Sequence, residues 1–119
     1  MRITPKSKYL DQPCSYVGTG CAYEDITGKR FTASLPEGLS DTGRATLQQL
    51  NGYVREHLKV KKKVYYRRAE RFKLRDFLAG NTDRAVIVVL GHAIYANGQD
   101  YWSFFKNEND EVVCIWYLA

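Results

Sequence analysis

The spacing of hydrophobic residues divides the chain into a helical first part and a β-rich last part. Leucine and valine recur at intervals of three or four residues from position 47 to position 58, which predicts an amphipathic helix over about 42–58. The residues at 84–90, RAVIVVL, are continuously apolar, as in a strand covered on both faces of a sheet. Helices followed by paired strands favour an α+β fold in which N-terminal helices pack on a C-terminal antiparallel sheet.

An earlier helix is predicted over 14–26, where the sequence reads CSYVGTGCAYEDI. This segment contains Gly18 and Gly20, and a glycine inside a helix costs about 1 kcal/mol relative to alanine. We therefore expect a buried helix with another part of the chain packed closely against its backbone. Residues 27–43 have the glycine and proline content of a loop, and Asp41 or Thr42 is the expected N-cap of the helix that follows.

The remaining elements are short and alternate with turn signals. Imperfect alternation predicts a strand with one solvated face at 60–66, and a brief helix at 73–80 ends at a glycine. The last strand, over 111–118, should place Cys114 on the same face as Val112, Trp116 and Leu118.

A hairpin is predicted by LGHAIYANGQDYW at 90–102, because Asn-Gly is a strong signal for a two-residue turn. With Asn97 and Gly98 as the turn, Ala96 would face Gln99. His92 would then lie opposite Ser103 on the neighbouring strand.

Length and composition fit one folded domain over residues 1–119, with 45% hydrophobic residues. No apolar run reaches the roughly 18 residues of a membrane span, and the N-terminus has no secretory leader, so a cytoplasmic protein without membrane contact is expected. The three cysteines and two histidines have neither the number nor the spacing of a disulfide framework or a zinc site. No metal or other cofactor is expected, and His57 is predicted to be a surface residue.

Much of the net charge of +5 lies in one stretch, 57–75, where Tyr65, Tyr66 and Phe72 lie among the basic residues. That combination is typical of single-stranded nucleic acid sites, and it also suits an acidic protein surface. The opposing interpretation is a solvated strand whose lysines protect a sheet edge from aggregation. The candidate binding residues are Lys61, Lys62, Lys63, Tyr66, Arg67 and Arg68.

Thiol catalysis is the chemistry that the sequence suggests most directly. Cys14 stands at the start of the first predicted helix, and a helix N-terminus favours a thiolate. An imidazole can act as the base, an amide can stabilise an oxyanion, and a further polar group can orient the imidazole. His92, Gln12 and Ser103 supply these three groups in the sequence.

The order of these motifs resembles papain-like cysteine peptidases, in particular the minimal papain-like proteins of bacteriophages. The likeness runs from Gln12 to Trp116 and includes KLRDFLAG at 73–80 and GHAIYANGQDYW at 91–102. It implies a minimal papain-like fold in which Cys14 is the nucleophile and His92 the general base.

The resemblance leaves some roles open. Gln12 is the candidate oxyanion donor, but it lies closer to Cys14 than is usual in the family, and its longer gap to Cys21 makes that cysteine a rival nucleophile. Ser103 occupies the place where the family commonly has aspartate or asparagine, and a different register would bring in Asn107.

The sequence therefore supports three candidate functions. The first is a small peptidase or amidase, acting on a peptide or amide substrate and located in the host cytoplasm if a phage encodes it. The second is an inactive or weakly active module of the same fold that binds a host protein or nucleic acid through residues 59–75. The third is a structural virion component without a site.

Overall fold

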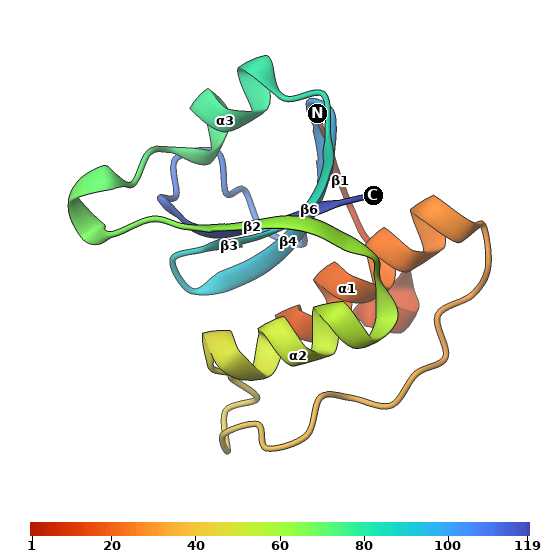
Figure 1. Ribbon diagram of the computed structural model, residues 1–119. Coiled ribbons are helices and arrows are strands. Elements are labelled where there is room, and N and C mark those ends of the chain that lie inside the picture. Colours follow the sequence, from red (N-terminus) through yellow and green to blue (C-terminus); the bar gives the residue numbers. More distant parts are fainter.

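The computed structural model describes residues 1–119 and contains three α-helices and a six-stranded sheet (Figure 1). The helices are α1 (Cys14–Thr27), α2 (Leu47–His57) and α3 (Leu74–Gly80). The strands are β1 (Arg2–Ile3), β2 (Val60–Tyr65), β3 (Arg84–Val89), β4 (His92–Asn97), β5 (Asp100–Trp102) and β6 (Val112–Leu118). Two short 3-10 turns, Ser7–Tyr9 and Arg68–Glu70, complete the structure.

The strands follow the order β1-β5-β4-β3-β6-β2 across the sheet. All neighbouring pairs are antiparallel except β1 and β5, which run parallel. The apolar strand β3 lies inside the sheet between β4 and β6, as its continuous hydrophobic sequence predicts. The α+β class is therefore confirmed.

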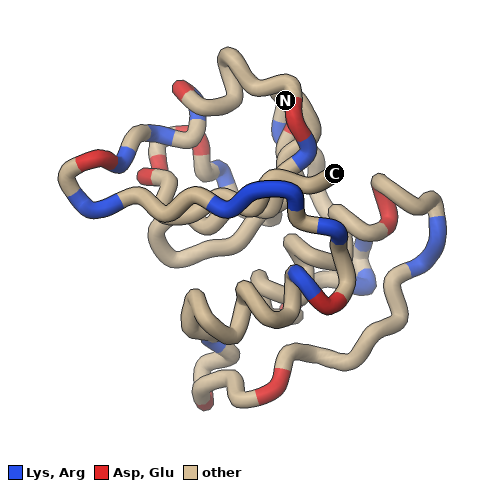
Figure 2. Tube along the Cα trace, viewed as in Figure 1, with Lys and Arg blue, Asp and Glu red and all other residues tan.

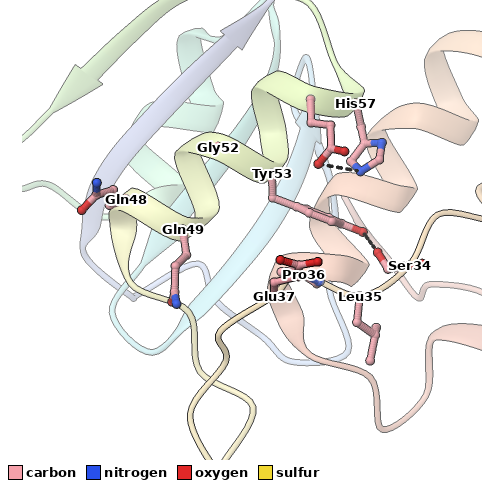
Figure 3. A pocket seen from close by; sticks show the side chains of 10 residues that line it. Ser34, Leu35, Pro36, Glu37, Gln48, Gln49, Gly52, Tyr53 and His57 are labelled. Atoms are coloured by element: carbon pink, nitrogen blue, oxygen red, sulfur yellow. Dashed lines mark hydrogen bonds and ion pairs between the residues drawn. The ribbon is translucent and has the colours of Figure 1, made fainter.

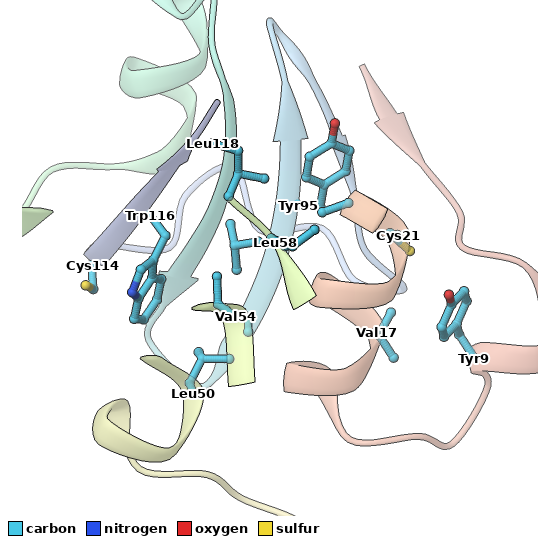
Figure 4. Packing of buried hydrophobic residues seen from close by; sticks show 13 residues of the cluster. Tyr9, Val17, Cys21, Leu50, Val54, Leu58, Tyr95, Cys114, Trp116 and Leu118 are labelled. Carbon is cyan, nitrogen blue, oxygen red and sulfur yellow. The ribbon is translucent and has the colours of Figure 1, made fainter. Parts of the chain in front are cut away.

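Helices cover both faces of this sheet: α1 and α2 lie on one face and α3 on the other (Figure 1). Alternation along β3 and β4 divides their side chains between two cores. Val86, Ala93 and Tyr95 belong to the core beneath α1 and α2 (Figure 4), whereas Ile87 and Ile94 belong to the core beneath α3. His92, at the first position of β4, pairs with Val89, a residue of the α3-side core.

Gly18 allows α1 to approach β4 closely. A Cβ added at Gly18 would meet the backbone of Ala93 and Ile94 at 3.4 Å. The expectation of a buried helix packed closely against another element is thus confirmed, and Cys14 lies one turn before this contact.

The start of α2 differs from the prediction, because neither Asp41 nor Thr42 caps the helix. Thr46 is the N-cap: its hydroxyl accepts from the N–H of Gln49 (3.1 Å), and the Gln49 side chain accepts from the N–H of Thr46 (2.8 Å). This reciprocal capping box satisfies two donors at once, so the helix begins at Leu47.

The hairpin turn also differs from the prediction. The turn residues are Gly98 and Gln99, and Ala96 pairs with Tyr101 rather than facing Gln99. Gly98 has a φ of +60°, whereas Asn97 remains in the strand and pairs with Asp100. A positive φ at the first turn position alone is the pattern of a type II′ turn, which requires glycine there. The predicted pairing of His92 with Ser103 is therefore wrong.

Four residues of β6 were expected on one face of the sheet, and three of them lie there, whereas Val112 does not. Cys114, Trp116 and Leu118 belong to the α1-side core, whereas Val112 belongs to the α3-side core. The register between β3 and β6 shifts between Val88 and Val89, and this irregularity moves Val112 to the opposite face. No helix of the structure combines the length and the apolar character needed to cross a bilayer.

Candidate functional site

Cys14 is the first residue of α1 and is partly exposed. The residue before it, Pro13, offers no side-chain cap, and the first α1 residue whose N–H is bonded is Val17, which donates to the Pro13 carbonyl (3.0 Å). The N–H groups of Cys14, Ser15 and Tyr16 therefore have no backbone partner, and no acidic side chain lies in this turn. Free donors at a helix N-terminus favour negative charge close to the Cys14 thiol.

Cys14 and His92 line the same cavity, which has a volume of about 260 Å³. Its other walls come from residues 44–47 and Leu50, from the β3–β4 connection and from Val113. Most of the lining is apolar. The structure thus brings the expected nucleophile and base from opposite ends of the sequence to one concavity.

The imidazole of His92 is held by stacking. Its ring lies 4.7 Å from the ring of Phe105, centroid to centroid, at an interplanar angle of 28°. No hydrogen bond joins the Cys14 sulfur to His92, and by strand alternation the side chain leaves β4 on the face of Val89. Because His92 is the first residue of its strand, its ring lies at the end of the sheet, next to the cavity.

Ser103 and Asn107 do not orient His92 in this structure. The Ser103 hydroxyl donates to Oδ1 of Asn107 (2.5 Å) and accepts from the N–H of Phe105 (3.1 Å). The Asn107 amide donates to Oδ2 of Asp110 (2.7 Å), and its backbone N–H donates to the Tyr101 hydroxyl (3.3 Å). Both side chains are buried, so this network stabilises the turn between β5 and β6.

Gln12 is exposed and does not line the cavity of Cys14. It borders a different groove, together with Tyr16 and Phe31. The structure therefore does not bring its amide into the cavity that Cys14 and His92 share.

The other two cysteines are buried. Burial raises the pKa of the Cys21 thiol to about 12, and the nearby Glu24 carboxylate adds to this effect. Burial likewise raises the pKa of Cys114. Neither thiol forms a thiolate readily near neutral pH, so the environment favours Cys14 over Cys21 as the nucleophile.

The basic stretch lies on β2, which is an edge strand of the sheet, and on the arm that follows it, formed by residues 66–73 (Figure 2). Lys61 forms an ion pair with Asp83 (3.1 Å). Lys62 lies over the ring of Tyr117 and Lys63 over that of Trp116, each at 5.7 Å, and these two aromatic residues pack on opposite faces of the sheet.

The rest of the arm is partly anchored. Tyr66 packs edge-on against Phe72, and its carbonyl accepts from Arg71 Nε (3.2 Å), while Arg67 and Arg68 are exposed at the short turn. The basic side chains therefore do not form one continuous groove. Lysines along an exposed edge strand also protect that strand from pairing with a strand of another molecule.

A second, larger groove of about 540 Å³ lies between α2 and residues 34–37 (Figure 3). Its lining is mainly polar, and the Tyr53 hydroxyl donates across it to the Ser34 carbonyl (2.7 Å). His57 borders this groove, but its ring packs edge-on against Phe31 and Tyr53 at 5.2 and 4.6 Å. The prediction that His57 is a surface residue therefore misses its partial burial among aromatic rings.

No group of three or more histidine, cysteine, aspartate or glutamate side chains is arranged to hold a metal ion. No protein-family model, curated protein or solved structure matches the chain.

Two residues near the cavity escaped the sequence analysis. Phe105 lies beyond the predicted hairpin, and Arg44 lies in a segment expected to be a loop or the start of a helix. A correct hairpin register would have found Phe105 opposite His92, whereas no sequence pattern points to Arg44.

Proposed function

We propose that the protein is a papain-like cysteine hydrolase of peptide or amide bonds, with Cys14 as nucleophile and His92 as general base and acid. The observation that carries this proposal is the cavity that both residues line. The unbonded N–H groups at the start of α1 support it, because such donors stabilise negative charge that develops during the attack on a carbonyl.

In the first half of the proposed reaction, His92 takes the proton of the Cys14 thiol and the sulfur attacks the substrate carbonyl. The carbonyl oxygen becomes an oxyanion, which accepts hydrogen bonds from N–H groups in the first turn of α1. His92 then returns the proton to the departing amine, which leaves an acyl thioester on Cys14.

In the second half, His92 removes a proton from a water molecule, and the resulting hydroxide attacks the thioester. The carboxylic acid product leaves, and the proton returns to the sulfur, which restores the free enzyme. No cofactor takes part in either half.

For this chemistry, the imidazole must turn toward Cys14 around the end of the sheet. Catalytic hydrogen bonds often tighten only in the substrate complex, so the absence of this bond here is compatible with the mechanism. Phe105 stacks on one face of the ring and leaves its edge free to move. Because no polar side chain holds the ring, we expect a slower enzyme than one with a carboxylate or amide partner.

Alkylation tests the pairing of Cys14 with His92. The protein is treated with iodoacetamide at several pH values from 5 to 9, and the labelling rate of each cysteine is measured by mass spectrometry. At pH 6, Cys14 should react at least about tenfold faster than a small unperturbed thiol such as 2-mercaptoethanol, whose thiolate is scarce at that pH. Cys21 and Cys114 serve as buried internal references.

His92→Ala should reduce the fast labelling at pH 6 by about tenfold, because the base that accepts the thiol proton is gone. His57→Gln, which changes the chain's other histidine, should leave it unchanged. A Cys14 rate that follows 2-mercaptoethanol across the whole pH range would overturn the proposed function. Circular dichroism of each variant verifies that the fold is retained.

A further inference from the structure

The lining of the cavity around Cys14 carries positive charge and no negative charge. Among the residues that line it, Arg44 is the one with a permanently charged side chain, and no carboxylate is present. The groove beside His57, in contrast, has Glu37 and Glu56 in its lining. The charged side chains that line the two concavities are therefore of opposite sign.

Arg44 is exposed, and its guanidinium has neither a salt bridge nor a hydrogen bond within the protein. Its backbone is anchored instead: the Arg44 N–H donates to Oγ of Ser40 (3.0 Å), and the Ser40 N–H donates to the Arg44 carbonyl (3.0 Å). The neighbouring Gly43 lies against the residue that precedes Cys14, since a Cβ at Gly43 would lie 3.8 Å from Cγ of Pro13. These contacts anchor the backbone of Arg44 close to the residue before Cys14, and Arg44 and Cys14 line the same cavity.

The remaining walls are apolar. Leu47 and Leu50 contribute from α2, and Val88 and Ala93 contribute from the sheet. At the β3–β4 turn, Leu90 is 51% exposed and extends the apolar lining toward solvent. A group bound here would bury apolar surface while its polar end reached Arg44.

We propose that this cavity selects substrates that carry an apolar group and a carboxylate close to the carbonyl attacked by Cys14. The inference rests on the proposed function, since it names the class of substrate for that site. The apolar group fills the space between α2 and the sheet, and the carboxylate pairs with Arg44. The start of α2 also faces this cavity, so its helix dipole adds to the preference for negative charge.

Two alkylating reagents of similar size but different charge test the role of Arg44. Iodoacetate is an anion and iodoacetamide is neutral, and both alkylate the same sulfur. The rate ratio of iodoacetate to iodoacetamide is measured at Cys14 at low ionic strength and is divided by the same ratio for 2-mercaptoethanol. We expect a normalised ratio of about two to five, which is the gain from an exposed ion pair.

Arg44→Gln should lower the normalised ratio toward one, and the part that remains reflects the helix N-termini at the cavity. Arg30→Gln removes the same charge from an exposed position after α1, at the other end of the connection to α2, and should leave the ratio unchanged. A wild-type ratio at or below one, or a ratio that Arg44→Gln does not lower, would overturn the proposed charge selection.

The apolar walls are tested with 2-bromo-4-methylpentanoate and bromoacetate, again normalised to 2-mercaptoethanol. The branched reagent should react with Cys14 at a higher normalised rate, whereas an equal or lower rate would contradict an apolar subsite. These results are separable from the proposed function. If Cys14 reacts rapidly with iodoacetamide and depends on His92 but shows no reagent selectivity, the substrate class is wrong and the hydrolase proposal stands. If Cys14 does not react faster than the reference thiol, both are wrong.

Discussion

Gly20→Ala and Gly52→Ala introduce the same methyl group into two different helices, with different expected effects on the free energy of unfolding. In both helices alanine has the higher propensity, by about 1 kcal/mol. At Gly52 in α2, an added Cβ meets no atom within 4 Å. The full propensity gain should therefore appear, as an increase of about 0.5–1 kcal/mol and a rise in Tm of about 3–5 °C.

At Gly20 in α1, the same methyl group has no room. Its Cβ would collide with the Tyr9 hydroxyl and would lie 2.8 Å from Cδ2 of Phe31. Both aromatic residues are buried, so the clash cannot be relieved by a shift into solvent. Overpacking of this kind costs about 1–3 kcal/mol, which cancels or exceeds the propensity gain. Gly20→Ala should consequently be about 1–3 kcal/mol less stable than Gly52→Ala.

Urea titration followed by tryptophan fluorescence measures the free energy of unfolding of each variant. A double-mutant cycle with Tyr9→Phe isolates the cause, because that substitution removes the oxygen that Cβ would meet. The Tyr9 hydroxyl is buried without a hydrogen-bond partner, so Tyr9→Phe alone should cost little stability. In the Gly20→Ala background it should recover part of the loss. Equal stabilisation by Gly20→Ala and Gly52→Ala would refute the close packing of α1 against Tyr9.

The remaining predictions concern the cap of α2 and the partly buried ion pair of Lys8 with Glu24. Thr46→Ala removes the hydroxyl that accepts from the N–H of Gln49, and it should lower the free energy of unfolding by about 1 kcal/mol in the same titration; an unchanged value would contradict the capping box. Burial alone would raise the pKa of Glu24, but hydrogen bonds from Lys8 (2.6 Å) and the Phe31 N–H (2.9 Å) outweigh it, so the pKa lies below its ordinary value. A depressed carboxylate pKa stabilises the fold above the unfolded-state pKa, and this stabilisation is lost as pH falls through the folded-state pKa. Glu24→Gln should therefore destabilise the protein at pH 7, and urea titrations should show that its deficit relative to the wild type shrinks toward pH 3; a deficit that stays constant with pH would argue against the ion pair.

The elements that the sequence predicts well are those whose signals are local. The leucine and valine spacing of α2 and the unbroken apolar run of β3 each need only a few neighbouring residues to specify a helix or a buried strand. The cap of α2 was missed by four or five residues. Several polar residues precede this helix, and only Thr46 has a glutamine three positions later that completes a capping box.

Sheet details depend on information that no local pattern contains. The observed hairpin register differs from the predicted one because the turn starts at Gly98 rather than at Asn97. A shift of the turn by one residue changes every opposed pair of the two strands. Val112 lies on the opposite face of the sheet from the one predicted, because the pairing of β3 with β6 is irregular at one point. The two-residue strand β1 went unpredicted, since it exists through its pairing with β5, about a hundred positions away in the sequence.

The candidate site combines both kinds of information. Cys14 and His92 are recognisable in the sequence because a thiol at a helix start and a histidine at a strand start are local features. Their convergence is a tertiary property: Gly18 lets α1 approach β4 at Ala93, which is the residue after His92, and Cys14 lies one helical turn earlier. A larger residue at Gly18 should therefore separate the two site residues before it unfolds the helix. The orienting group expected at Ser103 depended on the hairpin register, and the register that the structure adopts brings an aromatic ring to His92 instead. An imidazole held by stacking keeps its freedom to turn, so the proposed hydrolase activity should depend on substrate binding to draw His92 toward Cys14.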